Sequence, residues 1–323
     1  MNGAFRYLAR RLAFSAALVL GVSFLLFALI NAIGNPIDIL LAETPGVSAE
    51  SIASISKYYG LEGSFTDRYL AWLTAILQFD FGTSIIYNQP VADLLRLWGF
   101  ETLKLQIPAI LLSTLLAAAA GTLGATRQHG PADFGVVSAA MLGHSLPGFL
   151  IGILLILVFS YWLGILPSYG AYSTRAPLWG SDLADALWHM VLPVMMLTIF
   201  NTATLTLLMR SSLVEVLRQD FITAAWASGL PARRVVLGHA MRNAFIPVLT
   251  YLGSLFGLML GTAPVTETVF TWPGLGALYI AAIQQLDYPV IMGETMVITV
   301  MLVTATLLTD LAYVALDPRI RLA

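Results

Sequence analysis

Six runs of apolar residues, each about 20 residues or longer, dominate this chain of 323 residues. A run of about 20 apolar residues is long enough to cross a bilayer as an α-helix. The runs are continuous and lack the residue-by-residue alternation of a membrane β-barrel strand. The sequence therefore predicts an all-α polytopic membrane protein. Its six transmembrane helices are expected near residues 9–33, 101–126, 135–163, 187–210, 244–266 and 290–315.

Charged residues are scarce in this chain. They make up 11% of the sequence, against about 25% in a soluble domain. The formal net charge of -2 leaves no overall basic surface that would indicate nucleic-acid binding. The absence of cysteine excludes disulfides, zinc–thiolate sites, iron–sulfur clusters and thiol catalysis at once.

The first apolar run follows three arginines, Arg6, Arg10 and Arg11, as the hydrophobic part of a signal peptide would. The run is longer than that of a typical signal peptide, and no small-residue cleavage motif follows it. We therefore expect a retained transmembrane helix at this position.

The distribution of lysine and arginine predicts which side of the membrane each connecting segment faces. With the amino terminus inside, eleven basic residues fall on the inner segments and five on the outer ones. This bias follows the positive-inside rule, and an even number of spans places both termini in the cytoplasm. The outer segments, including residues 34–100, 164–186 and 267–289, are acidic and contain Glu267 and Asp287. The amphipathic segment 211–243 is expected to be cytoplasmic.

Within this cytoplasmic segment, the residues predict a short helix followed by a sharp turn. Asp220 suits the N-cap of a helix over residues 221–228. Gly229 suits the position just after its end, and Pro231 suits the first turn of a second helix. The sequence therefore predicts a helix–turn–helix that leads into the fifth span.

The first of these helices combines small residues with apolar ones. Ala224, Ala225 and Ala227 give it a surface of low relief, beside which we expect the side chains of Phe221, Ile222 and Trp226 to project. Such a helix fits the groove of a partner protein. It also fits the membrane surface, with its arginines at the lipid headgroups. Physical reasoning alone leaves both interpretations open.

The same segment resembles the coupling-helix motif of ABC importer permeases. The family pattern E-A-A-x-x-x-G aligns with Thr223, Ala224, Ala225 and Gly229, so that threonine stands in place of the glutamate. More closely, "EVLRQDF" at 215–221 and "RRVVLGHAMRNAFIPVLT" at 233–250 resemble the dipeptide/oligopeptide/nickel permease family. The likeness is collinear over nearly the whole chain. It includes "RYLARRL", "DFGTSIIYNQPVADLL", "HSLPGFLIGILLILVFSYWLGILPSYG", "ETVFTWPGLGALYIAAIQQLDYPVIMG" and "LDPRIRL".

This resemblance implies a type I ABC importer permease fold in a multi-pass protein of the bacterial inner membrane. The chain would form half of a pore for peptides or similar small solutes, opened by alternating access. Its expected partners are a second homologous permease in a heterodimer, two cytoplasmic ATPases, and a periplasmic or extracellular solute-binding protein. Residues 1–100 would form an N-terminal helix with a long external segment, and residues 101–323 a five-helix core.

The resemblance also implies which residues contact the ATPases. These are Asp220, Phe221, Thr223, Ala224, Ala225, Trp226, Gly229, Leu230, Arg233 and Arg234. The chain itself lacks the G-x-x-x-x-G-K-[ST] motif that cradles nucleotide phosphates. We therefore expect no enzymatic activity and no cofactor on this chain, with ATP and Mg²⁺ bound by the partner ATPases.

Polar residues within the spans are candidates for lining the pore. Asn201, Thr202, Thr204 and Thr206 form the densest polar group, in the fourth span, and of these Asn201, Thr202 and Thr206 are the candidates for pore lining. Glu267 at the outer end of the fifth span is suited to a substrate amine. Hydrogen bonding between helices is the alternative for the first group, and an ion pair is the alternative for Glu267. Gly253, Gly257 and Gly261 share one face of the fifth span. We expect this face to pack closely against another helix.

Other functions are less consistent with these residues. His144 and Ser145 are adjacent, so they point to different sides of a helix, and no third catalytic group accompanies them. The four histidines lack the i, i+4 spacing of a metal pair, and no metal site is expected. Transport of nickel or of opine-like or glutathione-like solutes remains an alternative within the family. An intramembrane enzyme and a non-catalytic membrane anchor are alternatives outside it.

Overall fold

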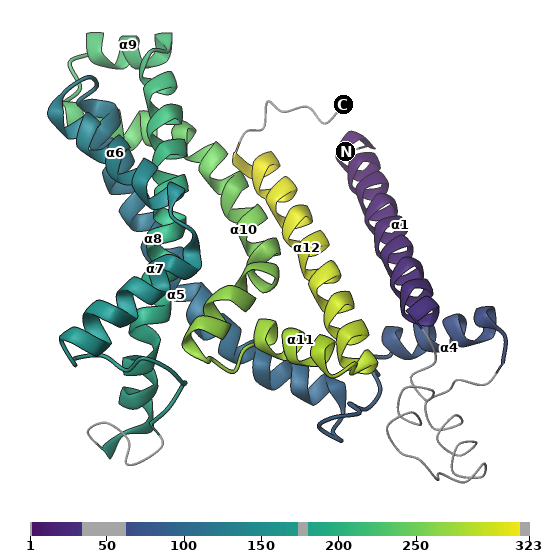
Figure 1. Cartoon of the computed structure of the whole chain (residues 1–323). Helices are drawn as coiled ribbons and strands as arrows, with labels where there is room; N and C mark the ends of the chain where they lie inside the picture. Colours follow the sequence, from purple (N-terminus) through teal and green to yellow (C-terminus); the bar gives the residue numbers. More distant parts are fainter. Residues whose placement is uncertain (1, 34–62, 174–179, 317–323) are drawn as a thin grey trace. The chain divides into compact units, whose positions relative to one another are not determined.

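The computed structural model describes residues 2–33, 63–173 and 180–316, except for the side chains of residues 2–8, 33, 256–262 and 310–316. Helices make up most of the described chain (Figure 1). Their bounds are α1 Asn2–Ile33, α4 Phe65–Leu77, α5 Val91–Thr126, α6 Pro131–Ser145, α7 Gly148–Leu155, η1 Ile156–Trp162, α8 Asp182–Leu217, α9 Asp220–Ala227, η3 Arg234–Ala240, α10 Met241–Phe270, α11 Leu275–Gln284 and α12 Tyr288–Leu316.

The helices agree with the predicted set of membrane spans. Among the described residues, five stretches are long and apolar enough to cross a bilayer: Ala9–Ala32, Val91–Thr126, Asp182–Leu217, Arg234–Leu255 and Tyr288–Thr309. A sixth span arises if the pair Pro131–Ser145 and Gly148–Trp162 is counted as one. The predicted all-α membrane fold is therefore confirmed.

The third span differs from the continuous helix that its apolar run suggested. It bends by 99° between Ser145 and Gly148. Pro147 causes the interruption, because proline lacks a backbone N–H and disfavours helical geometry at the residue before it. Accordingly, Leu146 is extended, with φ of -81° and ψ of 131°. The break leaves non-helical backbone within a predicted span.

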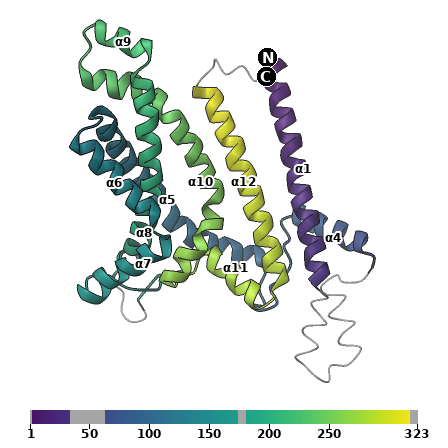
Figure 2. The same ribbon diagram turned by 45° about the horizontal axis from the view of Figure 1, so that its top comes forward.

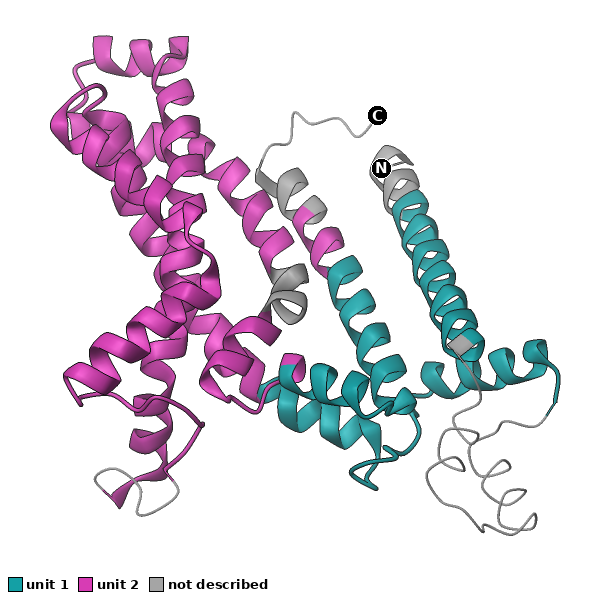
Figure 3. Ribbon diagram, viewed as in Figure 1, with its two compact units in different colours: residues 1–100, 277–304, 321–323 teal, residues 101–276, 305–320 magenta. Residues whose placement is uncertain are grey.

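The chain divides into two compact units (Figure 3). One comprises residues 1–100, 277–304 and 321–323, and the other comprises residues 101–276 and 305–320. The first therefore contains the predicted N-terminal section together with a later piece of chain. The expected functional division at residue 100 stays a prediction.

In the first unit, aromatic side chains join α4 to α1. Tyr69 of α4 packs edge-on against Phe24 and Phe27, with ring centroids 5.5 Å apart in both pairs. The Tyr69 hydroxyl lies 2.9 Å from the buried Ser23 hydroxyl, within hydrogen-bond distance. A capping box starts α4, in which hydrogen bonds from Ser64 lower the pKa of the Asp67 carboxyl. Helix α4 is thus a defined element packed on the first span.

In the second unit, α8 lies at the centre and packs against α6, α7 and α10 (Figures 1 and 2). Small residues allow these close approaches. A Cβ atom on Gly121 of α5 would lie 2.8 Å from Met209 Cβ of α8, and one on Gly152 of α7 would lie 2.8 Å from Met196 Sδ. Gly253 of α10 faces Thr309 of α12, whose side chain a Cβ would overlap. The predicted close packing of the fifth span is therefore present at Gly253, whereas Gly257 and Gly261 fall where side chains are not described.

Replacing Gly276 by alanine should destabilise the protein. Its Cβ would overlap the backbone of Pro264 in α10, and overpacking of this kind costs about 1–3 kcal/mol. Gly135→Ala is the matched control, because no atom lies within 4 Å of a Cβ at that helical position. Thermal unfolding of the detergent-solubilised chain should give a lower midpoint for Gly276→Ala and an unchanged or higher one for Gly135→Ala. Equal midpoints would contradict this packing.

Candidate functional site

The short helix α9 follows α8 after two intervening residues (Figure 2). It begins at Asp220, with Gln219 in the N-cap position, so the expectation that Asp220 itself caps the helix is wrong by one residue. The cause is the turn at the end of α8, where the Gln219 N–H donates to Val216 O and the Gln219 carbonyl accepts from the N–H groups of Ile222 and Thr223. The predicted helix nevertheless exists over nearly the expected range.

The end of α9 has the predicted turn. Ser228 is its C-cap, and Gly229 follows with φ of +73°. This left-handed conformation is costly for residues with a Cβ atom, so a glycine is required there. The Pro231 carbonyl then accepts hydrogen bonds from the N–H groups of Arg234 and Val235, which starts the next helical segment. The chain therefore reverses within a few residues and enters η3.

Ile222 fixes α9 to the rest of the second unit. Its side chain is fully buried in a cluster with Leu213 and Val216 of α8 and with Val235 and Ala240 of η3. Ala225 and Leu230 pack against the same cluster. The expectation that Ile222 projects from the surface is therefore wrong, because α8 and η3 both cover this side of α9.

The opposite side of α9 is exposed and nearly flat. Asp220, Thr223, Ala224 and Ala227 are all exposed. At 100° per residue they lie on the side of the helix away from Ile222. Phe221 and Trp226 flank this surface and are 40% and 45% exposed. Among the other predicted contact residues, Arg233 and Arg234 are exposed and Leu230 is half-buried. We call Asp220, Phe221, Thr223, Ala224, Trp226 and Ala227 the α9 surface.

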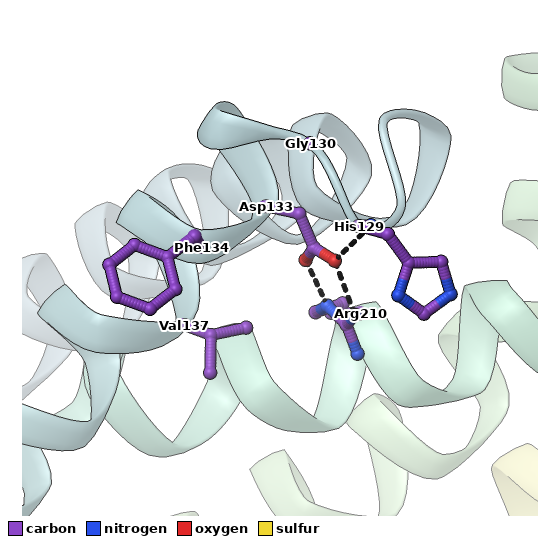
Figure 4. A pocket seen from close by; sticks show the side chains of 6 residues that line it. All are labelled: His129, Gly130, Asp133, Phe134, Val137 and Arg210. Atoms are coloured by element: carbon purple, nitrogen blue, oxygen red, sulfur yellow. Dashed lines mark hydrogen bonds and ion pairs between the residues drawn. The ribbon is translucent and has the colours of Figure 1, made fainter.

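An ion pair between Asp133 and Arg210 joins α6 to α8 (Figure 4). Arg210 Nη2 donates to Asp133 Oδ2 over 2.7 Å, and Arg210 Nε donates to Asp133 Oδ1. The His129 N–H also donates to Asp133 Oδ2, over 2.9 Å. Charge-assisted bidentate pairs of this type fix orientation as well as distance. Sequence reasoning treated Arg210 only as an inner charge and missed its pairing with a residue 77 positions away.

Gly124 and a hollow surround this ion pair. A Cβ atom on Gly124 would lie 3.3 Å from Asp133 Oδ1 and 3.4 Å from Arg210 Cδ, so glycine allows α5 to approach the pair. A hollow of about 330 Å³ lies beside it, and its walls include Gly130, Phe134 and Val137. The ion pair therefore ties together α5, α6 and α8 in the stretch of α8 that leads to α9.

The predicted pore-lining residues of α8 are largely enclosed within the second unit. Asn201 and Thr206 are buried, and Thr202 is half-buried. The hydroxyls of Thr198 and Thr202 are buried without a hydrogen-bond partner among the described residues. The role of this group in lining the pore stays a prediction.

Glu267 occupies a closed polar pocket at the end of α10. It is 1% exposed and accepts a hydrogen bond from the Thr102 hydroxyl of α5 over 2.7 Å. The Leu275 N–H donates to that same hydroxyl over 2.8 Å. A Cβ atom on Gly274 would overlap the Glu267 carboxylate. The carboxylate thus holds residues 271–276 against α5, and its predicted contact with a substrate amine stays a prediction.

Asp287 makes a similar contact in the first unit. It is fully buried, and its carboxylate accepts hydrogen bonds from the Ser84 hydroxyl and from the N–H groups of Ile85 and Ile86. Ser84 belongs to the stretch "DFGTSI", and its partner lies 203 residues later, so the local sequence does not indicate this contact. The acidic residue therefore anchors a turn rather than adding to an exposed acidic surface.

A third carboxylate, Asp185 near the start of α8, holds the loop before that helix. It accepts hydrogen bonds from the Ser173 N–H over 2.7 Å and from the Ser173 hydroxyl over 2.6 Å. His189 Nδ1 lies 2.9 Å from the Gly170 carbonyl. Ser173 Oγ also lies 3.4 Å from His189 Nε2, but the serine hydroxyl donates to the Asp185 carboxylate. His189 Nδ1 contacts a backbone carbonyl instead of that carboxylate, so these three groups lack the order of a catalytic triad. Across the described ranges, no cluster of three or more potential metal ligands was found.

Comparison with known proteins agrees with this architecture. Residues 109–322 match the family described as "Binding-protein-dependent transport system inner membrane component". The oligopeptide transport system permease protein AppB of Bacillus subtilis is 34% identical over 316 residues, covering 97% of this chain and 98% of that protein. The dipeptide transport system permease protein DppB of Escherichia coli K12 is 33% identical over 335 residues, covering 98% of each. The dipeptide permease DppB of Bacillus subtilis is 36% identical over 319 residues, again covering 98% of each.

A solved structure also shares the fold. A chain of the MetNI methionine ABC transporter, in an inward-facing conformation, aligns with a TM-score of 0.55 at 15% identity and covers 69% of this chain and 96% of that one. Together the comparisons define a permease subunit of an ABC importer. The chain belongs to the binding-protein-dependent transport system inner membrane component family, and is thus a multi-pass transporter subunit rather than an enzyme. This family works with separate ATPase and solute-binding partners.

Replacing Ile222 by alanine should loosen α9 without affecting membrane insertion. Truncating a buried isoleucine to alanine costs about 2–5 kcal/mol, and Ile222 is the fully buried side chain of α9. Phe221→Ala is the control, because Phe221 lies on the exposed side. Backbone hydrogen exchange over residues 220–228 should become faster in Ile222→Ala and stay near the wild-type rate in Phe221→Ala. Similar rates in the two variants would show that Ile222 does not anchor the helix.

Proposed function

We propose that this chain forms one half of the membrane pore of a peptide importer in the bacterial inner membrane. A second homologous permease forms the other half, and two cytoplasmic ATPases supply the energy of transport by hydrolysing Mg²⁺-bound ATP. A solute-binding protein delivers the peptide from outside. In this arrangement both chain termini and α9 lie in the cytoplasm, as the distribution of arginine indicates.

The assignment of peptides rests on similarity along the whole chain. The relatives named as oligopeptide and dipeptide permeases align over 97–98% of this sequence. The aligned region therefore contains the spans, the outer segments and the region of α9. Nickel and opine-like or glutathione-like solutes are alternative cargoes within the same mechanism, and an uptake assay distinguishes them.

The α9 surface is the site we assign to ATPase docking. It presents small residues flanked by Phe221 and Trp226, a shape that fits a groove on another protein. Ile222 is buried on the opposite side of α9, so it holds the helix with the α9 surface facing outward. Thr223 replaces the acidic residue of the family motif, so this contact depends on shape and apolar area more than on an ion pair at that position.

A movement of the ATPases would reach the spans through α8. Helix α9 packs on the end of α8 through Ile222, and the ion pair of Asp133 with Arg210 fastens α8 to α6. These contacts make α6, α8 and α9 one mechanical element within the second unit. Rocking of such an element between two orientations would couple ATP hydrolysis to alternating access.

A glutamate placed on the α9 surface should uncouple transport. Ala224→Glu adds a charge and a long side chain at the centre of this exposed surface, where a docked partner would desolvate it. The matched control is Ala71→Glu, a chemically identical change at an exposed position of α4. With the assembled transporter in proteoliposomes, ATP-driven peptide uptake should fall by at least about tenfold in Ala224→Glu and remain near wild type in Ala71→Glu.

The amount of ATPase that co-purifies with the permease should also fall in Ala224→Glu and stay near the wild-type amount in the control variant. Helix α9 lying on the lipid surface instead would leave ATPase binding intact in both variants. Wild-type uptake in Ala224→Glu would exclude the docking assignment. Uptake of a nickel or opine-like solute in place of peptides would show that the proposed cargo is wrong and would leave the docking assignment unchanged.

A further inference from the structure

The break in the third span exposes polar groups within the membrane-spanning part of the second unit. His144, Ser145, Leu146 and Pro147 are all exposed. Pro147 has no N–H, so one helical hydrogen bond is lost at this point. The Ser145 hydroxyl donates to Met141 O of its own helix. The third span therefore presents an imidazole and irregular backbone on the outside of the second unit.

The break lies deep in the bilayer if the ion pair of Asp133 and Arg210 marks the inner interface. His144 is eleven residues beyond Asp133 on the same helix, which at 1.5 Å per residue is about 16 Å along the axis. The hydrocarbon core is about 30 Å thick, so this distance reaches roughly to its middle. His144 is therefore placed where water from either side would not reach it without a passage.

Contact with α8 holds the imidazole in place. His144 Nδ1 lies 3.1 Å from Thr204 Oγ1. The missing side chain of Gly143 allows the two helices to approach, because a Cβ there would be only 3.2 Å from Ala203 Cβ. Several threonines of the spans, such as Thr114 and Thr295, donate their hydroxyl proton to a backbone carbonyl of their own helix. Thr204 has no such bond among the described residues, so its proton is available to Nδ1.

This hydrogen bond determines what His144 offers to its surroundings. When the Thr204 hydroxyl donates to Nδ1, the neutral ring carries its own proton on Nε2. Among the described residues, Nε2 has no hydrogen-bond partner. The ring therefore presents one N–H donor outward, and the acceptors that it suits are the carbonyl and carboxylate oxygens of a peptide.

Lipid is the least favourable surrounding for this surface. Irregular backbone at membrane depth is tolerated only where protein covers it or where it lines a water-filled cavity. Ionisable residues in spans face the bundle interior or such a cavity. Transporter solute sites are commonly built at interrupted helices near the middle of the bilayer. No described residue of the second unit covers the break, and a solute path would satisfy these constraints.

We infer that His144 and the break at residues 145–147 form a wall of the solute path, where the His144 Nε2–H donates to a carbonyl or carboxylate oxygen of the passing peptide. This assignment rests on the proposed function and locates the path on this chain. Thr204 acts as a positioning residue, because it fixes the ring and its tautomer.

The absence of cysteine from the chain allows a direct test. Single variants His144→Cys and Leu142→Cys are compared in the assembled transporter in lipid vesicles. Leu142 is 68% exposed but two residues away, about 200° around the helix. A charged, water-soluble thiol reagent reacts with the thiolate, which forms only in contact with water. Modification of this chain is measured by its change in mass.

We expect the thiol introduced by His144→Cys to react at least about ten times faster than the thiol introduced by Leu142→Cys. Ser145→Cys, a nearly isosteric change at an exposed position, replaces His144→Cys if that variant fails to assemble. Equal rates at positions 142 and 144, whether the break is covered by lipid or by the second permease, would overturn the assignment. Peptide uptake by the wild-type transporter in the same vesicles tests the proposed function separately.

Two further variants test the contact with the peptide. His144→Gln keeps an N–H donor and His144→Phe removes it. Loss of one neutral hydrogen bond should lower the uptake rate of His144→Phe by about two- to tenfold, with His144→Gln near wild type. Equal uptake in all three proteins would exclude a hydrogen bond between His144 and the solute.

Discussion

The requirement that every backbone N–H and C=O group be satisfied within the bilayer governs this structure. It explains why the described spans are helical, and it also makes any interruption informative. At the break, the Leu146 N–H still donates to Leu142 O and the Pro147 carbonyl accepts from the N–H groups of Leu150 and Ile151. The bend nevertheless places non-helical backbone beside a histidine that would be costly in lipid. Proline alone does not distinguish this position, because Pro108 and Pro193 lie inside continuous helices of other spans. The bend together with the exposed histidine distinguishes it. The interruption is therefore best understood as part of a polar surface, which is the basis for assigning it to the solute path.

Near the ends of the helices, buried carboxylates accept hydrogen bonds from backbone N–H groups, either directly or through a hydroxyl. Asp287 accepts hydrogen bonds from two consecutive N–H groups of a turn, and Asp185 accepts one from the loop before α8. Glu267 acts through the Thr102 hydroxyl, which in turn accepts from the Leu275 N–H. Because these acids lie at the ends of spans, their charges serve to fix the connecting segments. They contribute less to an exposed acidic surface than the sequence suggested.

The sequence predicts features that depend on local chemistry. The apolar runs define the spans, and Gly229 predicts the turn after α9 because a left-handed residue is needed there. Features that depend on distant partners could not be predicted. The burial of Ile222 requires η3 to fold back over α9, and Glu267 meets a threonine 165 residues earlier. Likewise, nothing near Arg210 in the sequence indicates Asp133. Proline alone could not predict the bend at Pro147, since Pro108 and Pro193 lie inside continuous helices.

Helix α8 connects these separate observations. Near its C-terminal end, α8 packs against Ile222 of α9 through Val216. Earlier in the same helix, Arg210 pairs with Asp133 of α6, and Thr204 contacts the imidazole of His144. Each contact joins α8 to a different part of the second unit, and packed helices transmit displacement with little compression. A force applied at the α9 surface would therefore shift α8 and α6 together, and with them the position of His144. In the proposed mechanism, α8 connects the docking surface to the solute contact, so that movement at one end would change exposure at the other.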